Sequence, residues 1–538
     1  MSIRKQSFIQ GAMILLAAGL LNRLLGFVPR IALPRIIGAE GVGLVQLVYP
    51  FMIVILTVIT GGLPLAVAKM IAEADSQGRS GEVQRIVRIA MTFAVTASLA
   101  AAAACLAMAE WISSVVMTDP RVHTAFLAMI PVLPMVAVSS VWRGYFQGKQ
   151  NMIPTAFSQT TETIVRIALT LTLTALLIPL GLEAAAAGAM AGMAVGELAG
   201  LLVLWLQIRR ESVDPAEAEK AGEADGKPPA AGKRDKGFAS AAMKESNRQL
   251  SRGLLRIALP VTGSRLIGSL SYLFESILTS RSLVAAGLAA SAATAQYGAL
   301  QGMVMPLLLL PGALTYSLAV SLVPALSDAA ARGDWAGIQK RLHQSMRLAI
   351  VTGAPFVALL GLLAQPICSL LYADDSMADM LRWLAPMAVF LYMQAPLQAA
   401  LQALNRPGTA LFNTFAGAIV KLVLIVQLAS KPDLGINGAI VAIAVNMGLV
   451  TLLHWISVTR LTGFRLLPTD FLKVLSAVIV TGAVAVWIWN LEGVPGGAVK
   501  LMAASAAAIA VYLLLLVWLR LVDRFDAARI PVIGRWFR

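Results

Sequence analysis

The stretch FQGKQNMIPTAFSQTTETIVRIAL at residues 146–169 aligns with LQALNRPGTALFNTFAGAIVKLVL at residues 401–424. The shift of 255 residues places the triplet IVR (164–166) on the triplet IVK (419–421). A second match, between LAVAKMIAEAD at 65–75 and LAVSLVPALSD at 318–328, has a shift of 253 residues. Because two distant matches share nearly the same shift, the sequence predicts an internal repeat.

The composition indicates an integral membrane protein. The chain has 538 residues, of which 58% are hydrophobic and 13% charged, whereas an ordinary soluble domain is roughly one quarter charged. Its mean hydropathy is +0.78. A helix needs roughly 20 apolar residues to cross a bilayer, and we expect about 14 such spans. The predicted fold is therefore all-α and polytopic.

The repeat and the charged segments divide the chain into four parts. We expect a six-helix bundle at 1–208, a disordered charged linker at 209–250, a second six-helix bundle at 251–461, and two additional helices with a basic tail at 462–538. Six spans is an even number, so both copies have the same orientation. The bundles are then related by a parallel repeat, with substrate sites between them.

The net charge of +15 follows membrane topology. Alternate loops are rich in Lys and Arg, and such residues are retained on the cytoplasmic side, so both termini are expected there. The basic segments lack the aromatic residues and recognition motifs of nucleic-acid-binding proteins. Cys105 and Cys368 stand alone, and the three histidines lack ligand spacing, so we expect no disulfide framework and no metal.

Two arginines in the first apolar segment, Arg23 and Arg30, lie seven residues apart. On one continuous helix this spacing would direct both to nearly the same side, where they would form a basic strip facing the interior. Arg30 has the alternative of reaching the membrane interface. A structural salt bridge is the alternative for Arg23.

Other charges also fall inside predicted spans, where they are costly and usually functional. The bases are Arg166, Arg265 and Lys421, and the acids are Glu162, Glu197 and Glu275. Glu162 and Arg166 have the i,i+4 spacing of an intrahelical pair. Lys421 has Gly417 at the corresponding position, so it lacks that local partner and is the better cavity residue. The three acids are candidates for carrying a coupling ion or for forming a charge pair.

A basic interior suits an anionic cargo such as a phosphate or pyrophosphate headgroup, because the planar guanidinium of Arg binds phosphate oxygens in pairs. The predicted ligands are Arg23, Arg30, Arg166, Arg265 and Lys421. The segment GAEGVG (38–43) lacks the Lys and Ser or Thr of a nucleotide-binding loop. We therefore expect no cofactor, and we find no catalytic constellation.

Several stretches resemble the stage V sporulation protein B group of polysaccharide exporters, in the MOP superfamily of lipid II flippases, O-antigen flippases and MATE drug exporters. They are KQSFIQGAMILLAAGLLNRLLGFVPR (5–30), GLPLAVAKMIAEADSQG (62–78), YFQGKQNMIPTAFSQ (145–159) and YGALQGMVMPLLLLPGALTYSLAVSLVPALSD (297–328). The NRLLGF segment is similar to the first-helix motif of the lipid II flippases, which gives Arg23 the role of a cavity arginine. Arg30 is displaced by one position from that motif.

The resemblance implies a flippase of the plasma membrane. It would move an undecaprenyl-pyrophosphate-linked sugar by alternating access, as a peptidoglycan precursor for the cell wall and particularly the spore cortex. The expected partners are this lipid, the bilayer, a coupling cation and cell-wall synthesis proteins. Two alternatives are a MATE-like exporter of cationic drugs, which would require an acidic cavity, and a membrane glycan polymerase, which would require outward-facing carboxylates.

Overall fold

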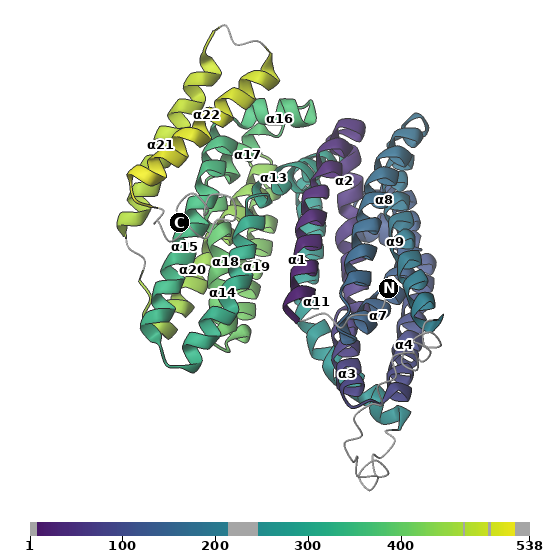
Figure 1. Cartoon of the computed structure of the whole chain (residues 1–538). Helices are drawn as coiled ribbons and strands as arrows, with labels where there is room; N and C mark the ends of the chain where they lie inside the picture. The colour runs from purple at the N-terminus through teal and green to yellow at the C-terminus, as the bar shows by residue number, and fades with distance from the viewer. Residues whose placement is uncertain (1–7, 214–245, 466–467, 493–495, 522–538) are drawn as a thin grey trace. The chain divides into compact units, whose positions relative to one another are not determined.

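The computed structural model describes residues 8–213, 246–465, 468–492 and 496–521. Every regular element in these ranges is a helix (Figure 1). Eleven of the described helices are long and apolar enough to cross a membrane, or up to twelve if the bent pair α17–α18 is one span. The predicted all-α polytopic fold is confirmed, whereas the predicted count of 14 spans is not.

The first half of the chain contains ten helices before the undescribed residues 214–245. Their bounds are α1 (Phe8–Leu25), α2 (Phe27–Thr60), α3 (Leu63–Ser76), α4 (Ser80–Ala107), α5 (Ala109–Trp111), the short helices η1 (Ile112–Val116) and η2 (Pro120–Val122), α6 (His123–Met129), α7 (Val132–Gly148), α8 (Ile153–Leu177), η3 (Ile178–Leu180) and α9 (Leu182–Val213), counting only those labelled α beyond three residues as long.

The second half follows the same order and adds two helices. The bounds are α11 (Asn247–Ala285), α12 (Ala290–Gly298), η4 (Ala299–Val304), α13 (Met305–Leu309), α14 (Gly312–Ala331), α15 (Trp335–Leu362), α16 (Ala364–Tyr372), α17 (Ala378–Leu384), α18 (Ala388–Ala403), α19 (Pro407–Ala429), α20 (Ile436–Thr462), α21 (Pro468–Asn490) and α22 (Gly497–Trp518).

The helix bounds repeat with the shift seen in the sequence. Both ends of α4 recur in α15 after 255 residues, and both ends of α6 recur in α17 after 255 residues. The starts of α8 and α9 recur in α19 and α20 after 254 residues. The parallel repeat with two additional C-terminal helices is therefore confirmed.

Two compact units form the molecule, and two long helices contribute to both. The first unit contains residues 1–29 and 47–273, and the second contains 30–46 and 274–538. Residues 30–46 of α2 and residues 251–273 of α11 thus belong to units other than those expected from the sequence. The expected linker at 209–250 is helical at both ends, since α9 reaches Val213 and α11 begins at Asn247. Its residues 214–245 lie outside the described residues.

Glycines explain why residues 39–46 of α2 join the second unit. Gly38 has φ 66°, ψ −179° and interrupts the helix, a conformation that other residues rarely adopt. A Cβ on Gly43 would lie 2.1 Å from the Thr294 carbonyl oxygen, and one on Gly298 would lie 2.2 Å from the Ala39 carbonyl oxygen. The two backbones can approach this closely only because both contact positions are glycine.

Three buried tyrosines donate hydrogen bonds to backbone carbonyls at irregular points of the second unit. Pro355 cannot donate to the carbonyl of Val351 in α15, and the hydroxyl of Tyr512 in α22 donates to that oxygen at 2.8 Å. Tyr392 donates to Leu308, near the end of α13, and Tyr372 donates to Met303 in the π-helix η4, each at 2.9 Å. These bonds satisfy backbone groups that lipid cannot.

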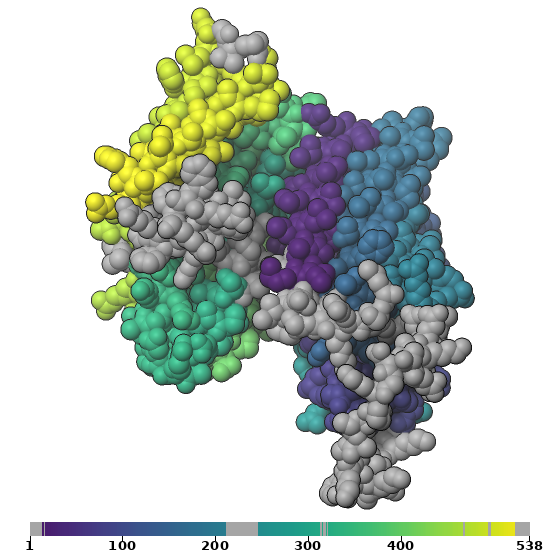
Figure 2. Space-filling model, in the orientation of Figure 1, coloured from purple at the N-terminus to yellow at the C-terminus, as the bar shows by residue number. Residues whose placement is uncertain are grey.

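The additional helices α21 and α22 lie on the outside of the second unit, where they form the yellow surface in Figure 2. Their outer faces carry exposed large apolar side chains such as Leu472, Ile479, Leu514 and Trp518. A surface of this composition is expected against lipid tails. The bond from Tyr512 fastens the pair to the core helix α15.

Candidate functional site

Closely packed helices α8 and α9 bring charged residues together in the first unit. Gly192, Gly196 and Gly200 of α9 face α8, as the spacing GAMAGMAVGELAG predicts for a small-residue stripe. A Cβ on Gly196 would lie 2.5 Å from the Cβ of Arg166, and one on Gly200 would lie 3.0 Å from the Cβ of Glu162. Glu197, adjacent to Gly196, is thereby held beside the charges of α8.

Five polar residues form what we call the α7–α8–α9 network: Ser139, Arg143, Glu162, Arg166 and Glu197. Nη2 of Arg143 donates to Oε2 of Glu162 at 2.7 Å, and Nη1 of Arg166 donates to Oε1 at 3.0 Å. The hydroxyl of Ser139 donates to Oε1 of Glu197 at 2.6 Å. Nη2 of Arg143 lies 3.6 Å from that oxygen. One arginine therefore links both acids.

The network is electrically balanced and largely buried. Its two arginines and two carboxylates sum to zero charge, which removes much of the cost of placing them in a membrane span. The exposed fraction of the side chain is 8% for Glu197 and 17% for Arg143, but 34% for Arg166. Arg166 is thus the member most accessible to a ligand.

The second unit carries a smaller buried cluster on α11, η4 and α19. Nζ of Lys421 lies 2.5 Å from Oε2 of Glu275, and the amide of Gln301 donates to Oε1 of Glu275 at 2.9 Å. The side chains of Lys421 and Glu275 are 11% and 9% exposed. The expectation that Lys421 has no acidic partner holds only within its own helix, because α11 supplies one.

Arg265 contacts backbone rather than an acid. Its Nη1 donates to the carbonyl of Gly61 at 2.6 Å, and the hydroxyl of Thr262 accepts from the N–H of Gly62 at 2.9 Å. These bonds satisfy backbone groups at the junction between α2 and α3, which would otherwise be unpaired. Arg265 therefore joins α11 to this junction within the first unit.

The structure separates Arg23 and Arg30. Arg23 lies near the end of α1 and Arg30 lies in the part of α2 that belongs to the second unit. Both are exposed in the chain. The expected basic strip on a single helix is not present, because a turn at Gly26 ends α1 and α2 begins at Phe27.

Two residues of these clusters were missed by the sequence analysis. Arg143 was counted among cytoplasmic loop charges, whereas α7 continues to Gly148 and directs Arg143 toward Glu162 and Glu197. Its position within an apolar run was the available signal. Gln301 is uncharged and sits on a π-helical turn, a feature frequent at functional sites.

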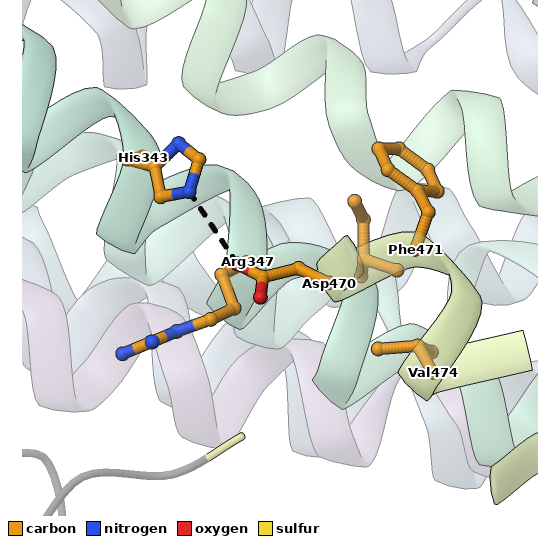
Figure 3. A pocket seen from close by; sticks show the side chains of 6 residues that line it. His343, Arg347, Asp470, Phe471 and Val474 are labelled. Atoms are coloured by element: carbon orange, nitrogen blue, oxygen red, sulfur yellow. Dashed lines mark ion pairs between the residues drawn. The ribbon is translucent and has the colours of Figure 1, made fainter. Parts of the chain in front are cut away.

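A small pocket at α15 and α21 is unsuited to a headgroup. His343, Arg347, Ile350, Asp470, Phe471 and Val474 line it, and its volume of about 10 Å³ is roughly that needed by one water molecule. Figure 3 shows the imidazole of His343 directed toward Asp470, with Nε2 3.4 Å from the carboxylate. The described residues contain no group of three His, Cys, Asp or Glu side chains that could hold a metal ion.

Comparisons with known proteins place the chain in a family. Residues 8–330 match the family described as "Polysaccharide biosynthesis protein". Over 99% of both chains, the protein is 38% identical to "Stage V sporulation protein B" of Bacillus subtilis (strain 168). The chain belongs to the polysaccharide biosynthesis protein family. Residues 269–426 also match the family described as "MatE".

More distant relatives share the whole architecture. The chain is 24% identical to "Lipid II flippase MurJ" of Bacillus subtilis (strain 168), over 94% of each chain. A solved structure of the lipid II flippase MurJ in an inward closed conformation has a TM-score of 0.67 at 13% identity and covers 94% of this chain and 98% of its own. An inward-facing MATE transporter of the MOP superfamily has a TM-score of 0.61 at 13% identity, covering 85% and 96%. These structures share the fold of this multi-pass membrane protein.

Proposed function

We propose that the protein is a flippase that moves an undecaprenyl-pyrophosphate-linked sugar across the plasma membrane by alternating access. Membership of the polysaccharide biosynthesis family and the similarity to stage V sporulation protein B and lipid II flippase MurJ support the assignment. The cargo is a peptidoglycan precursor, used for the spore cortex. The protein itself carries out no catalysis.

The observation that carries this proposal is a buried base at the same position of both repeats. Arg166 in α8 corresponds to Lys421 in α19 after 255 residues, and both lie well inside their helices. A base in a span is costly unless it serves a ligand or a partner. An anionic headgroup is the cargo that two such bases would favour.

Translocation by the purified protein tests the proposal. The protein is placed in vesicles with a labelled undecaprenyl-pyrophosphate disaccharide, and the label reaching the opposite leaflet is measured with an impermeant reagent. We expect transport by the wild type, its loss in Arg23→Ala, and its retention in Arg88→Ala, an exposed arginine of α4. A correctly folded wild type that leaves the lipid in its original leaflet would refute the flippase assignment.

The match to the MatE family makes cation export the competing function. An exporter of cationic drugs would need uncompensated acids, whereas each described buried acid of the two clusters has a basic partner. Uptake of a cationic dye into the same vesicles separates the two functions. We expect no dye movement in vesicles that translocate the lipid.

Both termini and the segment 209–250 are proposed to face the cytoplasm, because the loops on that side hold most of the Lys and Arg residues. Cysteine labelling from outside the cell would test this orientation. A coupling cation and cell-wall synthesis proteins are the proposed further partners. Labelling of the linker by an impermeant reagent in intact cells would contradict the topology.

A further inference from the structure

We propose that Arg143 and Arg166 form a phosphate-binding subsite in the first unit, and that Glu162 and Glu197 occupy it until a phosphate replaces them. On replacement, Glu197 takes up one proton from solution. An O–H bond forms on its carboxylate, and no bond of the phosphate breaks. The inference rests on the proposed function and adds the link between an anionic headgroup and a proton.

The position of Glu162 supports the exchange. Its two oxygens accept from two different guanidinium groups, at 2.7 Å from Arg143 and 3.0 Å from Arg166. A phosphate offers the same pair of oxygens at higher charge, and guanidinium groups bind it by parallel N–H···O bonds. Arg166 is the more exposed of the two arginines, so the phosphate would reach it first.

Glu197 is the acid that depends most on Arg143. It accepts one hydrogen bond from Ser139 and lies 3.6 Å from Arg143, which is beyond hydrogen-bond distance. If Arg143 turns to a phosphate, Glu197 is left buried with a single hydroxyl partner. An isolated buried carboxylate is costly and becomes protonated instead.

The charges around Glu197 allow this proton uptake. The groups that face it are Arg143 from α7 and the Glu162–Arg166 pair from α8, and the described contacts add no further charge. The third helix packed on α9 is α6, whose titratable residue is His123. That imidazole contacts the hydroxyl of Ser113 at 3.1 Å. Proton uptake therefore falls to the two carboxylates of the network.

The second unit repeats this arrangement with different residues. Lys421 occupies the position equivalent to Arg166, and Glu275 covers it from α11 rather than from the same helix. An ion pair kept only for stability has no reason to recur here, because buried pairs stabilise little relative to apolar packing. The recurrence of a base covered by an acid supports a role in exchange.

Binding of undecaprenyl pyrophosphate to the protein in nanodiscs, measured between pH 6 and 8, tests the inference. Uptake of one proton makes the affinity of the wild type fall about tenfold for each unit of rising pH. We expect Glu197→Gln to bind with an affinity that no longer depends on pH. Arg143→Ala should weaken binding about tenfold or more at every pH, whereas the control Arg88→Ala should match the wild type.

Proton uptake can be measured in the same samples with a dye in weak buffer. We expect about one proton per bound lipid for the wild type and none for Glu197→Gln. Wild-type affinity that does not change with pH, or a Glu197→Gln variant that keeps the pH dependence, would overturn the inference. If the wild type translocates the lipid-linked sugar but shows no proton uptake, this inference fails while the flippase assignment stands.

Discussion

Removing the charge of Lys421 should destabilise the second unit by leaving Glu275 without its base. In Lys421→Met the carboxylate keeps only the hydrogen bond from Gln301, at 2.9 Å. The two side chains are 11% and 9% exposed, so water can compensate little. Breaking a buried ion pair by removing one partner costs about 3–5 kcal/mol, and we expect the free energy of unfolding to fall by that amount.

The assay is unfolding in mixed micelles, followed by the fluorescence of the ten tryptophans. Lys340→Met, at an exposed lysine of α15, is the control and should change stability by less than about 0.5 kcal/mol. The double variant Glu275→Gln, Lys421→Met removes both charges and should recover most of the loss. A loss below about 1 kcal/mol in Lys421→Met, or a double variant as unstable as the single one, would refute the reasoning.

Three further substitutions test individual contacts. Gly196→Leu should lower the free energy of unfolding by about 1–3 kcal/mol, because its Cβ would lie 2.5 Å from that of Arg166; Gly81→Ala, with open space around it, is the control, and equal stability of the two would contradict the packing argument. Tyr512→Phe should cost about 1–3 kcal/mol by leaving the Val351 carbonyl unsatisfied, with Tyr49→Phe as the comparison in the same unfolding assay. Gly298→Val should loosen α2 from α12, seen as faster proteolysis, and an unchanged digestion rate would argue against the contact.

The sequence predicted what depends on local pattern. Apolar runs and the 255-residue shift gave the helices and the repeat, because both are written along one stretch of chain. The pair Glu162–Arg166 followed from its i,i+4 spacing. The glycine stripe of α9 indicated a close helix contact, although it could not show that α8 is the partner.

The remainder of the clusters depends on tertiary contacts. Glu275 lies 146 residues before Lys421, so no local spacing connects them. Arg143 meets Glu197 only because the glycines of α9 allow α7, α8 and α9 to converge. The transfer of residues 30–46 to the second unit depends on the contact between Gly43 and α12, which is likewise absent from any local pattern.

The most direct test of the proposed function is the initial rate at which the protein, in vesicles, translocates a labelled undecaprenyl-pyrophosphate disaccharide. The comparison is between wild type and a variant that lacks both equivalent bases and their acids, Glu162→Gln, Arg166→Gln, Glu275→Gln and Lys421→Met. Because acids and bases are removed together, the net charge is unchanged and folding should be retained. We predict transport by the wild type and none by the folded variant. Equal rates for the two proteins would contradict the assignment of these bases to the headgroup.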